Sequence, residues 1–142
     1  MHATRILLVL FAAVATAGCG DGLAKVSGTV TLDGQPIVGG SGVHGSVNFY
    51  PANGSGVPAV GIIDASGRYK LMSGSRNGTE PGAYLVSIAM NIITLPTKPS
   101  EMPQPTLITP KKYASMSESG LRAEIKAGSN TLDFDMSSKP AK

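Results

Sequence analysis

The chain has one cysteine, no tryptophan and two histidines among its 142 residues. A single cysteine cannot form an internal disulfide, and structural metal sites normally combine several His or Cys ligands. Charged residues make up 15% of the chain, and the net charge is only +3. The few aromatic residues do not alternate with basic ones, as they do on many nucleic-acid-binding surfaces. We therefore expect no metal site, no cofactor and no nucleic-acid partner.

Glycine and proline are abundant, with 18 and 10 copies, and 42% of the residues are apolar. This composition suits short strands joined by many turns, and it argues against wholesale disorder. The length suits one domain.

The first 18 residues have the features of an export signal. Arg5 precedes an apolar run at 6–15 that is too short to be a permanent membrane span. Ala17-Gly18-Cys19 then resembles a bacterial lipobox. The resemblance implies that Cys19 is acylated, inserts into a bilayer and begins a short tether at 19–23. Gly20 at the next position favours the outer membrane over the inner one. The alternative is an ordinary secretory signal with an incidental cysteine.

Alternating apolar and polar residues predict strands in the rest of the chain. About seven such segments, separated by turn residues, are typical of an antiparallel Greek-key β-sandwich. We expect this all-β domain to span 24–136 and to be followed by a disordered tail at 137–142. The predicted strands are 25–32, 43–50, 59–64, 68–72, 83–90, 121–126 and 131–136.

Residues 91–120 include five prolines and form the longest predicted connection. Loops of this length are usually functional or disordered, so this one is a candidate partner-binding loop. We expect it to cross the surface and return at Tyr113, which packs back on the sandwich. The residues that we expect to contact a partner are Leu95, Lys98, Met102 and Leu107.

Two short motifs predict structural roles. Asp64-Ala65-Ser66-Gly67 is turn chemistry, in which Gly67 is free to take a positive φ. Pro81-Gly82-Ala83-Tyr84 is similar to the tyrosine corner of sandwich folds, in which the phenol of a tyrosine bonds a nearby main-chain group.

With these segments placed, the chain resembles the carboxypeptidase regulatory-like, transthyretin-like sandwich domains, and in particular the short lipoprotein versions common in planctomycete bacteria. The resemblance implies a prealbumin-like (Ig-like) sandwich in the cell envelope and implies no established activity. The stretches that carry it are 26–36, 64–69, 81–86, 110–113, 119–121 and 130–136.

Few residues in the sequence suggest catalysis or metal binding. His44 is the only histidine after the signal, and a solvated strand histidine explains it better than a metal ligand. Asp64, Asp133 and Asp135 could contribute oxygen ligands for Ca²⁺, but a solvated face accounts for them better. We expect a non-enzymatic envelope module that spaces or binds proteins or polysaccharide. The alternative is a transthyretin-like hydrolase or an accessory subunit of an envelope enzyme. The sequence indicates no oligomeric state.

Overall fold

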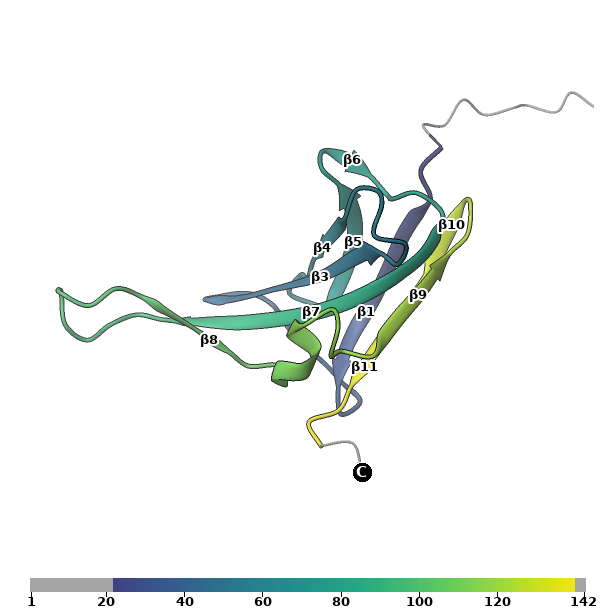
Figure 1. The fold of residues 1–142 in the computed structure, drawn as a ribbon. Coiled ribbons are helices and arrows are strands. Elements are labelled where there is room, and N and C mark those ends of the chain that lie inside the picture. Colours follow the sequence, from purple (N-terminus) through teal and green to yellow (C-terminus); the bar gives the residue numbers. More distant parts are fainter. Residues whose placement is uncertain (1–21, 140–142) are drawn as a thin grey trace, which may run out of the picture.

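The computed structural model describes residues 22–139 and has an all-β fold, as predicted (Figure 1). This range contains no α-helix and one short 3-10 helix, η1 (Lys111–Ala114). The predicted signal peptide and Cys19 lie outside the described residues. The strands are β1 (Lys25–Leu32), β2 (Gln35–Pro36), β3 (Val43–Pro51), β4 (Ala59–Ile62), β5 (Arg68–Ser73), β6 (Arg76–Asn77), β7 (Gly82–Thr94), β8 (Gln104–Leu107), β9 (Leu121–Ile125), β10 (Ser129–Thr131) and β11 (Phe134–Met136).

The strands form one curled sheet with the order β10-β1-β5-β4-β3-β7-β8. Strand β9 pairs with the first part of β7, and β10 pairs with β1, although only residues 126–128 separate β9 from β10. The sheet therefore curls until its two sides meet at this turn (Figure 1). Each of the seven predicted segments contains a strand, and β2, β6 and β8 are additional short strands.

The inner face of the curled sheet holds the core. Strand β3 pairs with β7 so that Val47 lies opposite Ile88 and Phe49 opposite Val86, and all four side chains are fully buried. The Phe49 ring lies 6.3 Å from that of Tyr69 on β5 and 5.9 Å from that of Phe134 on β11. Aromatic side chains from distant strands thus fill the space inside the curl.

The C-terminal strand differs from the prediction of one continuous antiparallel strand at 131–136. It is divided into β10 and β11 by Leu132 and Asp133, and both parts pair with β1 in parallel. The division arises because Leu132 turns toward the core, where its carbonyl accepts a hydrogen bond of 2.6 Å from the Tyr69 hydroxyl. The amide of Leu132 donates to the Ser27 carbonyl at 2.9 Å.

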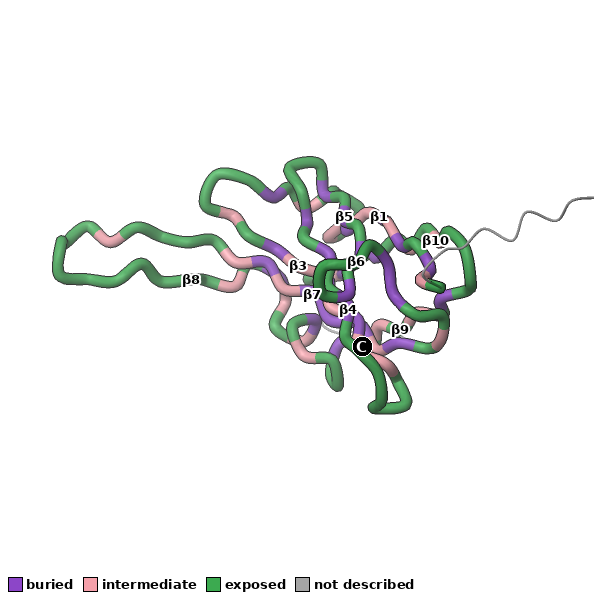
Figure 2. The backbone as a smooth tube through the Cα atoms, turned by 90° about the horizontal axis from the view of Figure 1, so that it is seen from above, coloured by how far each residue is buried: buried purple, intermediate pink, exposed green. Residues whose placement is uncertain are grey.

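The interpretation of 91–120 as one long loop is corrected. Strand β7 continues to Thr94, and residues 91–94 pair with β8 at 104–107. The apolar and β-branched residues Ile92, Ile93 and Thr94 favour this extension. We call residues 91–107 the arm; Figure 2 shows it as an exposed hairpin that projects from the buried core. The chain then returns through η1.

The prolines of the arm are compatible with pairing because β8 is an outer strand. The amide of Ile93 donates to the Gly42 carbonyl on the β3 side of β7. Residues of an antiparallel strand alternate in the side to which their N–H and C=O groups point. The nitrogen of Pro105, which lies opposite Ile93, therefore points away from β7. Proline is tolerated at such an edge position, since no ladder hydrogen bond is lost there.

The expectation of a disordered tail from residue 137 is wrong for residues 137–139. The amide of Ser137 donates to the Tyr113 hydroxyl at 2.9 Å, and the amide of Ser138 donates to Asp33 Oδ1 at 3.0 Å. Tyr113 itself is buried in η1. Helix η1 and the segment after β11 are thus fixed to each other, while 140–142 lie outside the described residues.

Candidate functional site

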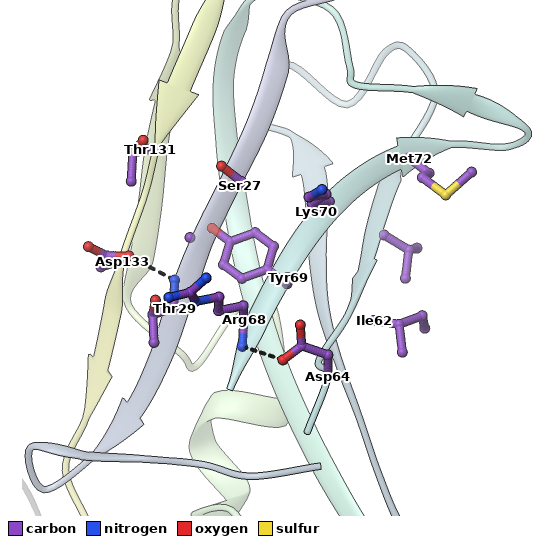
Figure 3. Close-up of a pocket in the computed structure, with 12 residues that line it drawn as sticks. Ser27, Thr29, Ile62, Asp64, Arg68, Tyr69, Lys70, Met72, Thr131 and Asp133 are labelled. Atoms are coloured by element: carbon purple, nitrogen blue, oxygen red, sulfur yellow. Dashed lines mark hydrogen bonds between the residues drawn. The ribbon is translucent and has the colours of Figure 1, made fainter. Parts of the chain in front are cut away.

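A hollow lies on the outer face of β1, β5 and β4, where the side chains of Arg68, Lys70 and Met72 are exposed (Figure 3). Its volume is about 730 Å³, and we call it the outer hollow. The strands alternate there, so that Arg68, Lys70 and Met72 point outward while Tyr69 and Leu71 point inward. The lining residues are Ser27, Gly28, Thr29, Val60, Ile62, Asp64, Arg68, Tyr69, Lys70, Met72, Thr131 and Asp133.

One side of the outer hollow is basic and polar. Arg68 lies opposite Thr29, and Lys70 lies opposite Ser27, in the pairing of β5 with β1. The only ion pair among residues 22–139 joins Lys98 and Glu101. Arg68 and Lys70 therefore bring two positive charges to the hollow with no carboxylate of the described chain within 4.0 Å.

The other side of the outer hollow is apolar. Val60 lies opposite Met72 in the pairing of β4 with β5, and Val60, Ile62 and Met72 are 39%, 69% and 41% exposed. Ile62 and Ile63 are adjacent in the sequence; Ile62 lines the hollow and Ile63 is buried in the core. Because Asp64 and Asp133 line the hollow together with Arg68 and Lys70, its formal charges balance, and the exposed apolar ridge is its most distinctive feature.

The carboxylates near this hollow bind main-chain amides of the protein itself. Asp133 Oδ1 accepts a hydrogen bond of 2.7 Å from the Thr29 amide. Asp64 Oδ1 accepts from the Ser66 hydroxyl at 2.6 Å, the Ser66 amide at 2.8 Å and the Arg68 amide at 3.1 Å. These bonds, chiefly that from the Ser66 hydroxyl, lower the pKa of Asp64. Both carboxylates thus fix turns and strand ends.

His44 does not line the outer hollow. It is exposed on β3 opposite Asn91 and lines a separate open hollow beside 40–46. Within residues 22–139, no three His, Cys, Asp or Glu side chains gather in a way that could hold a metal ion.

The tip of the arm has a second candidate surface. Leu95 and Met102 are 75% and 77% exposed and line one hollow of about 410 Å³. Lys98 Nζ lies 3.7 Å from Glu101 Oε1 on the tip. Leu107 lies at the base of the arm, opposite Asn91, and is half-buried. Of the four predicted contact residues, the structure therefore brings Leu95 and Met102 together and keeps Leu107 apart.

The residues predicted for structural roles lie in turns and in the core. Tyr84 is buried; its hydroxyl donates to the Glu80 carbonyl at 2.8 Å and lies 3.0 Å from Thr79 Oγ1. The hydrogen bond from Tyr84 to Glu80 spans Pro81 and Gly82 at the start of β7. Gly67 has a φ of 78°, in the left-handed region that favours glycine.

Sequence reasoning missed the contact between Tyr69 and Leu132. Tyr69 lies opposite Gly28 on β1, and a Cβ at Gly28 would overlap the Leu132 carbonyl oxygen. On the other side of the ring, a Cβ at Gly61 would lie 2.7 Å from Tyr69 Cδ2. A glycine inside an alternating strand often marks such a close approach. Gly28 was therefore the residue in the sequence that could have indicated this contact.

Between residues 22 and 139 the structure contains no helix that is long and apolar enough to cross a membrane. Comparisons with protein families, curated proteins and solved structures found no match to this chain.

Proposed function

We propose that the protein is a non-enzymatic lipoprotein of the cell envelope, anchored through acylated Cys19, whose β-domain spaces or binds other envelope components. The lipobox-like Ala17-Gly18-Cys19 after an apolar run supports the anchor. The components that such a module would contact are proteins or polysaccharide. The outer membrane is the favoured site, because Gly20 follows the cysteine.

We further propose that the domain is a Greek-key sandwich of the transthyretin-like, carboxypeptidase regulatory-like kind. The curl of the sheet supports this architecture, because side chains of β3 and β11 meet across the interior. The ring of Phe49 on β3 lies 5.9 Å from that of Phe134 on β11, although β4, β5 and β1 lie between these two strands in the order of the sheet. Inner faces that meet over one core are the defining feature of a sandwich.

The observation that carries the binding role is the arm. Its first strand is the end of β7, whose earlier residues are paired with β3 and β9 in the body of the sheet. The tip therefore stands on a rigid element and exposes Leu95 and Met102. Recognition residues are commonly presented in this way, on a loop held by a stable scaffold.

A capture experiment tests the arm. Wild type and the double variant Leu95→Ser/Met102→Ser would each be cross-linked in intact cells, purified and compared for associated envelope components. The proposal predicts that the double variant loses a partner that wild type retains. Val57→Ser is the control, since Val57 is 59% exposed and lies outside the arm. Identical partner sets for all three proteins would eliminate the arm as the binding surface.

Membrane fractionation tests the anchor. Cys19→Ala removes the residue that would be acylated, so we expect the variant to leave the membrane fraction while wild type stays in it. A variant that remains membrane-bound contradicts the lipid anchor.

A further inference from the structure

The folded sheet begins very close to Cys19 in the chain. Ala24 is fully buried and exchanges two main-chain hydrogen bonds with Thr79, of 2.7 and 3.0 Å. The amide of Lys25 then donates to the Gly128 carbonyl at 2.8 Å. The polypeptide is therefore held in the sheet from Ala24 onward, and only residues 20–23 separate it from Cys19.

This short connection limits how the domain can sit on a bilayer. Cys19 and Ala24 are five residues apart, and a fully extended chain of that length spans at most about 18 Å. Strand β1 has eight residues, from Lys25 to Leu32, so it is about 26 Å long. Suppose that Cys19 is held at the membrane and that the domain is inverted, so that it rests on the bilayer with the Leu32 end of β1. Ala24, at the other end of the strand, would then lie about 26 Å above the membrane surface. The connection is too short for that orientation.

Three segments surround Ala24, and we call them together the tether end. They are the start of β1, the segment from β6 to Thr79, and the turn at 126–128 between β9 and β10. Figure 1 shows β6 and the start of β10 at the same end of the molecule as the start of β1. Exposed basic side chains here are Lys25, Arg76 and Lys126; the acidic ones are Glu80 and Glu124. The opposite end carries the 64–67 turn, because the Val30 amide donates to the Gly67 carbonyl.

We infer that the tether end faces the phospholipid headgroups and that the 64–67 turn points away from the bilayer. This inference rests on the proposed acylation of Cys19. Three basic and two acidic side chains give this end a net charge of +1, so the short connection to Cys19, more than charge, sets the orientation. Strand β7 starts beside the tether end at Gly82 and runs for 13 residues, or about 40 Å, so the tip of the arm lies far from the anchor.

Position-specific quenching tests this orientation on the full chain. The sequence has one cysteine, which acylation blocks, so a single introduced cysteine provides the only thiol for a fluorescent label. Ala127→Cys places the label at the tether end, and Ala65→Cys places it at the opposite end. Both are exposed alanines in turns, so the two substitutions are matched. Each labelled protein would be purified from membranes and reconstituted in vesicles of phosphatidylethanolamine and phosphatidylglycerol that carry a contact-range quencher on the headgroups.

We expect quenching at Ala127→Cys to be several times that at Ala65→Cys. Equal quenching at the two sites, or stronger quenching at Ala65→Cys, overturns the orientation. Wild type, which has no introduced thiol, is labelled in parallel. If it takes up dye and fails to associate with vesicles, Cys19 is not acylated, and both the lipid anchor and the orientation built on it are wrong. If it excludes dye and binds vesicles, the two label positions decide the orientation alone.

Discussion

The hydroxyl of Tyr69 donates a hydrogen bond of 2.6 Å to the main-chain carbonyl of Leu132, 63 residues further along the chain. It joins the inner face of β5 to the point where the C-terminal strand divides. Burial, with Asp133 as a second cause, raises the pKa of this hydroxyl above its ordinary value. The tyrosine therefore keeps its proton, and the bond its donor, throughout the physiological range.

Replacing Tyr69 by Phe should destabilise the protein by about 1 kcal/mol, because the partly buried Leu132 carbonyl would lose its donor. Urea unfolding followed by circular dichroism measures this change. Tyr50→Phe is a matched control, since the Tyr50 hydroxyl has no hydrogen-bond partner among residues 22–139 and the side chain is only half-buried. Equal stabilities of the two variants would contradict the role given to the Tyr69 bond.

Gly28→Ala should also destabilise the protein, by about 1–3 kcal/mol or more, as expected for overpacking an interior. The added methyl group would overlap the Leu132 carbonyl oxygen, which belongs to the main chain and cannot rotate away. Ser27→Ala, one residue earlier on the outer face of β1, should change stability little. If the Gly28→Ala variant is as stable as wild type, the main chain at Leu132 can move away from the added methyl group without cost.

Tyr84→Phe should lower the free energy of unfolding by about 1 kcal/mol, the usual loss for one hydrogen bond. The variant removes the donor to the Glu80 carbonyl and leaves the buried hydroxyl of Thr79 without its partner at 3.0 Å. Thermal melting beside the Tyr50→Phe control measures the effect. No loss of stability would count against a tyrosine corner at this position.

Asp64 should make stability depend on pH in the acid range. Its pKa is lowered in the folded protein, mainly by the Ser66 hydroxyl, from an ordinary value of 3.8. A lowered folded-state pKa stabilises the protein above pH 3.8, and this contribution disappears as the pH falls through the folded value. Asp64→Asn should therefore melt below wild type at pH 7, and the difference should shrink below about pH 4.

Melting temperatures of wild type and Asp64→Asn across pH 2 to 7 test this dependence. Glu118→Gln is the control, because it removes an exposed carboxylate that accepts no hydrogen bond within the described chain. A constant difference between wild type and Asp64→Asn at all pH values would show that the carboxylate charge does not stabilise the turn.

Alternation and turn residues were enough to predict the strands, because these signals are local. Val43, Val47 and Phe49 share the inner face of β3, as their spacing of two or four residues requires. The turn at Gly67 also follows from local chemistry. Strand partners were harder to predict, since the parallel pairing of β10 and β11 with β1 joins residues more than 100 positions apart.

The candidate surfaces also combine features that local sequence predicts with features that depend on distant segments. Leu95 and Met102 could be selected because they are apolar residues in a proline-rich segment, but the pairing that makes the segment an arm could not be predicted from the prolines. The outer hollow could not be predicted at all. It depends on four segments coming together, and the roles of Asp64 and Asp133 depend on which amides they reach.

The position of Pro105 has a consequence for how the protein behaves at high concentration. A projecting hairpin whose outer strand offered a full row of amide donors would be a template on which other extended chains could add. At position 105 the outward nitrogen carries no hydrogen, so the ladder of a newly added strand would be interrupted there. The arm can therefore remain exposed with less risk of edge-to-edge aggregation, and a partner would have to recognise its side chains instead of extending its sheet.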